Sequence, residues 1–465
     1  MNSDSIIQKF SKILQTHLNN YSGDKSGSLF SFRFPLHGYD YDRIVVSLIN
    51  NNKSAFYFQK PSENVRFLGV GKVLSVRSDS HDRFGDLKTA LSGVKKLPVQ
   101  HYNGTTDENM PLFVGSMSFF PGINGEMWKD FFPSDWFVPE FIISETSKGC
   151  IVSYNINIDK ESGKQPKIAR LEQFFDQINV PLSSVPEKSF TCQRVKEESG
   201  QKDAWMGKVS SAVDAIKRNE INKVVLSRYI TINRVDALSI IAKITEAGKS
   251  FKDCYIFLYK SGLSLFMGIS PEKLASFAGD TVHCNAIAGS TARGRTDEED
   301  IRLGEELLKS EKNLDEHRIV VDHIQSVLGQ HCSSVTVDRS PVLKKLSYIQ
   351  HLYTPVQGVL HRGVSLFRVL EDLHPTPAVG GYPLEPALKI IREMEQYDRG
   401  LYTGFLGWFD AEGNADFCVA LRSALLVGNT LHAFAGGGIV MDSKPPEEYE
   451  ETEIKLQAIT SLLYP

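Results

Sequence analysis

Residues 435–455 read AGGGIVMDSKPPEEYEETEIK, a glycine-rich strand followed by the start of an acidic helix. Three successive glycines let backbone N–H groups approach an anion closely, although a tight strand exit explains them equally well. In the helix, Glu448, Glu451 and Lys455 are spaced i, i+3 and i+7 and project from nearly one face. A solvated Glu–Lys pair on a helix is common and contributes only ~0.2–0.5 kcal/mol, so this helix alone does not identify a site.

Upstream of this segment, the chain from about residue 200 alternates helical and extended segments. Helical periodicity covers residues 204–219, 237–248, 298–328 and the terminal 446–463, and the segments between them are rich in β-branched and aromatic residues. Several of these strands follow each other through short turns, which favours antiparallel pairing over a relay of parallel strands and helices. We therefore predict an α+β fold.

The first 190 or so residues are strand-rich. Segments such as RIVVSL (43–48) and SAFYF (54–58) are dominated by β-branched and aromatic residues, which favour strands. A polar stretch that begins at Cys192, CQRVKEESGQKD, has no apolar periodicity and is the best candidate boundary. It divides the chain into an N-terminal strand-rich part, residues 1–195, and a second part, residues 200–465.

The composition shows no large charge surplus. The 465 residues include 52 Lys+Arg and 56 Asp+Glu, a formal net charge of −4, so we expect binding neither to nucleic acid nor to a membrane surface, which need a basic surplus. The six cysteines have no metal-ligand or disulfide spacing. The N-terminus lacks the apolar core of a signal peptide, and no apolar run approaches the ~18 residues of a membrane span. We expect a cytoplasmic protein.

Three further segments carry side chains that suit catalysis. In EKNLDEHRIVVDHI, Glu316 lies beside an apolar stripe, so it either reaches water or turns inward to a metal; two inward carboxylates completed by waters suit Mg²⁺. In KVVLSR, Lys223 either pairs with a carboxylate or faces a dry pocket, where its pKa would fall from ~10.4 towards 7 and make it a general base. In GISPEKL, Pro271 and Glu272 are typical of a helix start.

Together and in this order, these segments resemble the chorismate-utilising enzymes. The similarity covers about residues 223–455 and runs through KVVLSR, GISPEKL, NAIAGSTARG, EKNLDEH, LHPTPAVGG, DRGLYTGFLGW, FCVALRS and the glycine-rich segment with its helix. The resemblance implies an α+β fold in which large antiparallel β-sheets pack together, flanked by helices, with the active site between them. It also implies that the two parts of the chain form one intertwined unit.

Within this family, the sequence is most similar to the isochorismate synthases. Lys223 occupies the position of their water-activating lysine, and HPTPA at 374–378 resembles their pattern rather than that of the ammonia-using enzymes. The resemblance implies a Mg²⁺-dependent isomerase that converts chorismate to isochorismate by water attack at C2 with loss of the C4 hydroxyl. Lys223 would be the base and Glu272 the acid, on opposite faces of the ring.

The resemblance also implies a set of binding residues. Glu316 and Glu451 would hold Mg²⁺, with Glu448 in its outer shell; Asn313 departs from the family, which has a carboxylate three residues before Glu316. Arg422 and Tyr402 would hold the pyruvyl carboxylate. The complete set of implied substrate-binding residues is Ala288, Gly289, Ser290, His351, Val379, Tyr402, Arg422, Gly436, Gly437 and Lys455.

Other activities stay open from the sequence. A salicylate synthase, which goes on to eliminate pyruvate, is the first alternative, and an ammonia-using anthranilate or aminodeoxychorismate synthase subunit is the second. A non-catalytic anion-binding protein on the same scaffold should have lost a residue such as Lys223 or Arg422, yet both are present. We expect chorismate as the small-molecule partner, no glutaminase subunit and a monomer. The sequence does not decide between menaquinone and siderophore biosynthesis.

Overall fold

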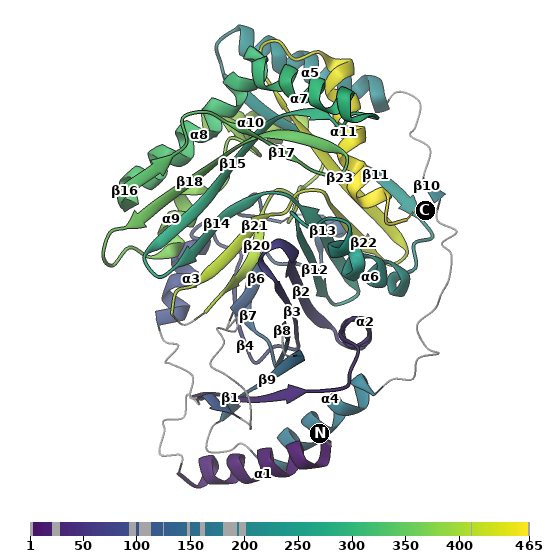
Figure 1. Cartoon of the computed structure of the whole chain (residues 1–465), viewed down its shortest axis with the longest axis vertical. Helices are drawn as coiled ribbons and strands as arrows, with labels where there is room; N and C mark the ends of the chain where they lie inside the picture. Colours follow the sequence, from purple (N-terminus) through teal and green to yellow (C-terminus); the bar gives the residue numbers. More distant parts are fainter. Residues whose placement is uncertain are drawn as a thin grey trace.

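The computed structural model describes residues 3–20, 28–92, 99–101, 113–123, 125–146, 149–158, 163–179, 193–194, 201–410 and 412–463. In these residues the chain forms two large, mostly antiparallel β-sheets that lie against each other, with helices on their outer sides (Figure 1). The predicted α+β class with packed antiparallel sheets is therefore confirmed.

The first sheet has 13 strands among the described residues and combines strands from both parts of the chain. Its order is β10 (Gln193–Arg194), β11 (Lys223–Asn233), β23 (Thr430–Ile439), β22 (Ser423–Val427), β13 (Ser264–Ser270), β12 (Tyr255–Ser261), β2 (Ser54–Lys60), β3 (Val65–Val70), β8 (Phe141–Thr146), β9 (Gly149–Ile158), β1 (Ser28–Leu36) and β5 (Val99–His101), and β19 (Gly381–Tyr382) pairs with β11. The one parallel pair among these strands is β1 with β5.

The second sheet has 10 strands among the described residues and also draws on both parts of the chain. Its order is β16 (Cys332–Val337), β18 (Ile349–Leu360), β15 (Thr281–Ala292), β14 (Lys273–Ala278), β21 (Ala415–Val419), β20 (Phe405–Phe409), β6 (Phe113–Met117), β7 (Ser134–Val138) and β4 (Leu74–Ser78), and β17 (Val342–Lys345) pairs with β18. The two parts thus share both sheets, while residues 195–200, where we predicted the boundary, lie outside the described residues.

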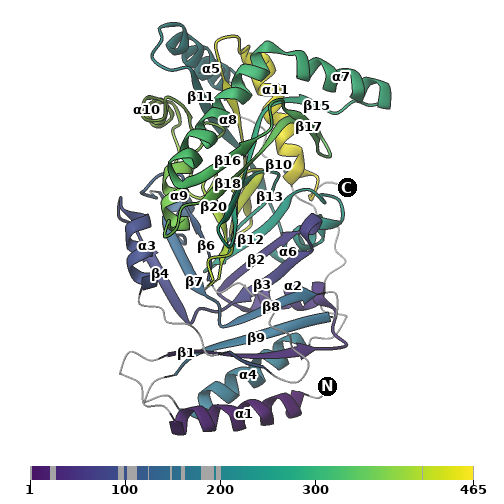
Figure 2. The same cartoon turned by 60° about the vertical axis from the view of Figure 1, so that its left-hand side comes forward.

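The helices cover the outer faces of the sheets and gather at the two ends of the molecule (Figures 1 and 2). Near the N-terminal end are α1 (Ser3–Asn20), α2 (Tyr41–Asn51) and α4 (Lys164–Ile178). The others are α3 (Arg83–Ser92), α5 (Gln201–Lys217), α6 (Ala237–Glu246), α7 (Asp297–Lys309), α8 (Glu311–His331), α9 (Leu366–Leu373), α10 (Leu384–Met394) and α11 (Pro445–Thr460). Of these, α5, α7, α8, α10 and α11 lie together at the opposite end (Figure 2).

Strand β2 shows how the core is built from alternating side chains. Phe56 and Phe58 point into an aromatic cluster between the sheets, whereas Ala55 and Tyr57 point to the cluster under the outer helices. Because successive side chains of a strand face opposite sides, a strand that is covered on both faces is apolar throughout. All four of these side chains are fully buried.

The helical assignments differ from the sequence prediction at three places. RIVVSL was expected to be a strand but lies in α2, where the Asp40 carboxylate accepts a hydrogen bond from Arg43 N and caps the helix. The long helical region is two helices, α7 and α8, with Ser310 between them. Pro271 and Glu272 do not start a helix; they connect β13 to β14.

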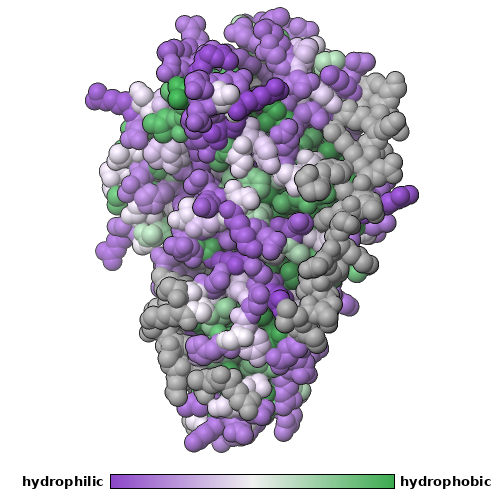
Figure 3. Space-filling view, turned by 45° about the vertical axis from the view of Figure 1, so that its right-hand side comes forward, coloured by the Kyte–Doolittle hydropathy of each residue, from purple (hydrophilic) through white to green (hydrophobic). Residues whose placement is uncertain are grey.

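The described surface of the protein is largely hydrophilic, as expected for a sequence without a long apolar run. Hydrophilic side chains predominate over much of the face in Figure 3. No helix in the described part of the chain is long and apolar enough to cross a membrane. The cysteines among the described residues are all free and buried.

Candidate active site

A cavity of about 70 Å³ lies between the two sheets. It is lined by Val225, Pro271, Glu272, Ile287, Ala288, Gly289, Ser290, Glu316, His351, Ala378, Val379, Tyr402, Thr403, Leu421, Arg422, Ala435, Gly436, Gly438, Glu451 and Lys455. The structure therefore brings together residues that are as far apart in sequence as Val225 and Lys455. Three of the predicted site residues do not line this cavity: Lys223, Gly437 and Glu448.

Lys223 begins β11 and is completely buried. Its Nζ lies 2.9 Å from Oε1 of Glu316, which α8 brings to the cavity. Nζ makes no hydrogen bond of regular geometry with any described residue, so this ion pair is its main polar contact. Burial raises the pKa of Glu316, but the ammonium groups of Lys223, Lys455 and Lys312 together lower it below its ordinary value. Glu316 is therefore held ionised.

The three glycines of β23 leave room for side chains from other elements. A Cβ on Gly438 would lie 2.3 Å from Glu316 Oε1 and 3.0 Å from Lys223 Cε. A Cβ on Gly436 would lie 3.1 Å from the Tyr402 hydroxyl oxygen. These glycines lie inside a paired strand, hydrogen-bonded to β11, so a tight strand exit does not explain them. Their small size instead lets a lysine, a glutamate and a tyrosine reach the strand.

Helix α11 presents two further carboxylates beside the same strand. Glu451 pairs with Lys455, with 2.6 Å between Oε1 and Nζ, and Nζ also donates a hydrogen bond to Gly436 O at 2.9 Å. Glu448 is buried and pairs with Lys312 at 2.9 Å. Burial and the neighbouring Glu451 raise the pKa of Glu448, against the opposing effect of Lys312. The repulsion between the two carboxylates marks a place where added positive charge would be favourable.

These carboxylates suit a divalent cation only in part. No group of three or more His, Cys, Asp or Glu side chains is placed to chelate a metal within the described ranges. However, Mg²⁺ typically takes one or two carboxylates and completes its octahedron with waters and substrate oxygens. Glu316 and Glu451 both line the cavity, and their oxygen donors match that preference. Each is now paired with a lysine, so a cation would displace an ammonium group.

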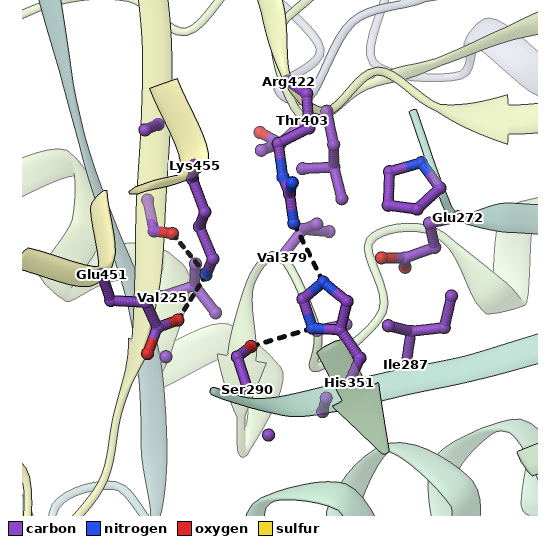
Figure 4. Close-up of a pocket in the computed structure, with 18 of the residues that line it drawn as sticks. Val225, Glu272, Ile287, Ser290, His351, Val379, Thr403, Arg422, Glu451 and Lys455 are labelled. Carbon is purple, nitrogen blue, oxygen red and sulfur yellow. Dashed lines mark hydrogen bonds and ion pairs between the residues drawn. The ribbon is translucent and has the colours of Figure 1, made fainter. Parts of the chain in front are cut away.

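Glu272 lies on another side of the cavity, in the connection between β13 and β14. Its side chain is buried, and burial raises its pKa to about 7, although the charges of Lys223 and Lys344 act in the opposite direction. Figure 4 shows Glu272 and the Glu451–Lys455 pair at opposite ends of the pocket. A carboxyl group with this pKa holds a proton near neutral pH and can donate it to a leaving oxygen.

Between these two ends, Arg422, His351 and Ser290 form a connected row (Figure 4). Arg422 Nη2 lies 3.0 Å from His351 Nε2, and His351 Nδ1 lies 2.9 Å from Ser290 Oγ. Burial, with Arg422 and Lys455 nearby, holds the pKa of His351 well below its usual 6.5. His351 is therefore neutral, and the guanidinium of Arg422 provides the positive charge in the middle of the cavity.

Arg422 and Thr403 line the cavity in a left-handed backbone conformation, with φ of 46° and 59°. Non-glycine residues rarely adopt this conformation, which costs on the order of 1–3 kcal/mol and is concentrated at functional sites. Thr403 N donates to Ala420 O at 3.1 Å. Tyr402, which precedes Thr403, stacks on Phe434 with 5.1 Å between ring centroids. These contacts hold the unusual conformation of Thr403 at the cavity wall.

Three residues that support the site, Arg399, Glu395 and Lys344, were not predicted from the sequence. Arg399 is fully buried and donates to Val225 O at 2.7 Å and to Val379 O at 2.9 Å, so it ties two cavity-lining segments together. Glu395 pairs with it at 2.6 Å. Lys344 donates to Pro271 O at 3.0 Å, next to Glu272. The Glu395–Arg399 spacing of i, i+4 resembles an exposed helix pair, and only the fold reveals its burial.

The His374 side chain of HPTPA supports the cavity from behind. Its Nε2 lies 3.0 Å from Thr403 O, and its ring packs 5.1 Å from that of Phe405. The peptide bonds His374–Pro375 and Tyr382–Pro383 are cis. Ala378 and Val379, later in the same segment, line the cavity.

Comparison with known proteins gives consistent matches over most of the chain. The family model described as chorismate binding enzyme matches residues 15–464. The chain is 34% identical over 414 residues to isochorismate synthase MenF of Bacillus subtilis (strain 168), covering 88% of this chain and 87% of that protein. It is 41% identical over 261 residues to the salicylate biosynthesis isochorismate synthase of Pseudomonas aeruginosa, covering 56% and 54%.

Among solved structures, the fold is similar to that of MenF, the menaquinone-specific isochorismate synthase from Escherichia coli. The TM-score is 0.73 at 23% sequence identity, and the alignment covers 98% of this chain and 100% of that one. At this identity the likeness shows the shared fold.

Proposed function

The chain belongs to the family of chorismate-binding enzymes, and from this membership we propose that it is an isochorismate synthase, an isomerase that converts chorismate to isochorismate. The family predicted from the order of the motifs is confirmed. The alignment with an isochorismate synthase over 88% of the chain supports the activity. Within the site, the proposal rests most on Lys223, because a buried lysine beside the cavity supplies a base for water.

The reaction moves a hydroxyl group between two ring carbons and therefore needs both a base and an acid. Water attacks C2 of the ring, the ring double bonds shift, and the C4 oxygen leaves. Hydroxide is a poor leaving group, so the C4 oxygen must receive a proton as it departs, while the attacking water must lose one. One water is consumed and one is released, which leaves the composition of the substrate unchanged.

We assign the base to Lys223. In the structure its ammonium group pairs with Glu316, so it must give up a proton before it can accept one from water. Because Nζ makes no regular hydrogen bond with any described residue, it would have hydrogen-bonding capacity left for a water molecule.

We assign the acid to Glu272. A general acid is most effective when its pKa lies near the working pH, since it then holds the proton and still releases it readily. Burial brings the pKa of Glu272 to about 7, which meets this condition. Pro271, whose carbonyl accepts a hydrogen bond from Lys344, fixes the connection that carries the carboxyl group.

Glu316 and Glu451 would hold a Mg²⁺ ion, with Glu448 behind them in contact with its hydration shell. When bound, Mg²⁺ would supply Lewis-acid polarisation of the ring carboxylate. Both carboxylates, on α8 and α11, line the cavity, and Gly438 leaves space for that of Glu316, which supports this assignment. In the structure Lys223 pairs with Glu316 and Lys455 pairs with Glu451, so a bound cation would compete with both ammonium groups.

The remaining cations would bind the second carboxylate of chorismate. Arg422 can form two parallel hydrogen bonds with a carboxylate, a geometry that lysine does not offer. Tyr402, Lys455 and Gly436, which line the cavity, would complete this side of the site together with the backbone of the neighbouring Gly437. We further propose that the enzyme acts as a monomer on free chorismate and without a glutaminase subunit.

Product analysis tests this function. Purified protein is incubated with chorismate, with Mg²⁺ or with a chelator, and the products are separated by chromatography. We expect isochorismate only when Mg²⁺ is present. Salicylate with pyruvate would replace the proposal by a salicylate synthase, and an amino product formed with ammonium salts would assign the ammonia-using branch.

A further inference from the structure

Asn313 lies in the first turn of α8 and contacts the second sheet at an irregular point. The pairing of β15 with β18 shifts register between Ala288 and Ser290, so that Gly289 is an extra residue in a β-bulge. Gly289 has a φ of +75°, and a Cβ there would lie 3.0 Å from both Cβ and O of Asn313. Helix α8 therefore packs directly on the bulge through this residue.

The amide of Asn313 bridges the bulge and the helix end. Its Oδ1 accepts a hydrogen bond from Ser290 N at 3.3 Å, and its Nδ2 donates to Ser310 Oγ at 2.8 Å. Ser310 is the N-cap of α8, which accepts from Asn313 N. One side chain thus satisfies a backbone donor in the bulge and anchors itself to a helix cap.

The contact with Arg422 fixes which ring nitrogen of His351 carries the proton. A guanidinium can only donate, so Nε2 of His351 must accept the contact from Arg422. A neutral imidazole then carries its proton on Nδ1, which donates to Ser290 Oγ. Because that oxygen accepts from the ring, the hydroxyl hydrogen of Ser290 is left to donate to an oxygen in the cavity.

We propose that Asn313 is a positioning residue for the proposed reaction: it fixes the Gly289–Ser290 bulge and, through Ser290 and His351, sets the direction in which Arg422 presents its guanidinium to the substrate carboxylate. This inference rests on the proposed function. His351 and Arg422 are 4% and 9% exposed, so surrounding atoms restrict the movement of both side chains. Their orientation within this space is set by their hydrogen bonds. Asn313 acts on substrate binding without touching the substrate.

This role differs from the metal outer shell, where a carboxylate at this position would act. An amide carries no charge, and both of its polar atoms are already engaged by Ser290 and Ser310. Replacement of Asn313 should therefore change the affinity for chorismate and leave the affinity for Mg²⁺ unchanged. A change in the affinity for chorismate alone indicates the positioning role, whereas a change in the affinity for Mg²⁺ indicates a role in the metal outer shell.

The test measures steady-state kinetics of the wild type and Asn313→Ala over ranges of chorismate and Mg²⁺. Loss of one or two hydrogen bonds predicts a rise in KM for chorismate of about 5- to 10-fold, with the half-saturating Mg²⁺ concentration within about 2-fold of the wild type. An unchanged KM, or a half-saturating Mg²⁺ concentration that rises as much as KM, overturns the inference.

A matched control separates positioning from loss of stability. Asp236 caps α6, accepting from Ser239 N at 2.8 Å, and lies outside the cavity lining. Asp236→Ala should lower the melting temperature at least as much as Asn313→Ala does and leave KM unchanged. If the two variants raise KM equally, the effect is general loosening and the inference fails.

A double-mutant cycle and a spectrum complete the test. If Asn313 acts through His351, then Asn313→Ala should raise KM by less than 2-fold in a His351→Ala background, whereas multiplicative effects overturn the inference. In the wild type, the ¹⁵N spectrum should show His351 as the neutral Nδ1–H tautomer, and a proton on Nε2 contradicts it. Wild-type protein that leaves chorismate unchanged would instead remove the proposed function itself.

Discussion

Lys223 Nζ and Glu316 Oε1 lie 2.9 Å apart where β11, β23 and α8 meet, and the glycine at 438 is what permits this contact. One strand supplies the lysine, a helix 93 residues later in the chain supplies the glutamate, and a second strand supplies the space. The proposed base and the proposed metal ligand are therefore coupled. Whatever binds Glu316 changes the surroundings of Lys223.

Gly438→Ala should disturb this pair without unfolding the protein. The new Cβ would lie 2.3 Å from Glu316 Oε1, the far end of a flexible side chain, which must move. We expect kcat/KM to fall at least about 10-fold, since positioning errors near 1 Å cost about 100-fold in well-oriented reactions. Gly329→Ala in α8, with open space at its Cβ, is the control and should keep full activity. Equal activity of the two variants would contradict the role of this contact.

Lys223→Met should abolish turnover and preserve substrate binding. It removes the base while filling most of the buried volume, and chorismate binding measured by calorimetry in the presence of Mg²⁺ should remain. Lys72→Met is the comparison variant. The Nζ of Lys72 lies 2.7 Å from Oδ2 of the buried Asp135, and neither residue lines the cavity. This variant should cost stability but keep kcat. Substantial activity in Lys223→Met would exclude the base assignment.

Glu272 should make stability depend on pH in a defined direction. Its pKa is raised from 4.5 to about 7 in the folded protein, so the folded state binds more protons than the unfolded state between these values. The contribution of Glu272 to the free energy of unfolding is therefore fully present below pH ~4.5. This contribution falls by on the order of 3 kcal/mol as the pH rises towards 7.

The comparison of wild type with Glu272→Gln isolates this effect. Urea unfolding at several pH values should show the wild type losing stability relative to the variant between pH 4.5 and 7, with a constant difference at higher pH. The variant should also lack activity, because glutamine cannot donate the proton to the leaving oxygen. A stability difference that does not vary with pH would show that Glu272 titrates normally.

Arg399 should matter for stability more than any exposed arginine. Its guanidinium is fully buried and bonded to Glu395, Val225 O and Val379 O. Arg399→Ala leaves a buried carboxylate without its counter-charge, which typically costs about 3–5 kcal/mol. Denaturant unfolding measures the loss. Arg218→Ala breaks an exposed pair with Glu220 and should change stability by less than about 1 kcal/mol.

Much of the site could be predicted from the sequence because its residues fall in ordered motifs. Glu272, Glu316 and Glu451 were each weak signals alone, and the structure places all three at one cavity. The bulge at Gly289 and the contact between Lys344 and Pro271 could not be predicted, because they depend on strand register and on contacts between segments distant in sequence. Such contacts leave no local periodicity.

The glycine segment and α2 show why local patterns were misread. The sequence allowed anion contact or a strand exit for Gly436 to Gly438, whereas the neighbours that need the space come from distant segments. RIVVSL has strong strand propensity, but Ile44 and Leu48 lie on the buried face of α2. Burial against the sheet outweighs a propensity difference of about 1 kcal/mol.

Oxygen-isotope labelling shows whether water attacks C2 of the ring. The enzyme is incubated with unlabelled chorismate and Mg²⁺ in H₂¹⁸O, and isochorismate from the first few per cent of conversion is analysed by mass spectrometry. We expect isochorismate that is heavier by 2 mass units, with the label on the C2 hydroxyl, and we expect the remaining chorismate to be unlabelled. Isochorismate that forms without the label would contradict attack of water at C2.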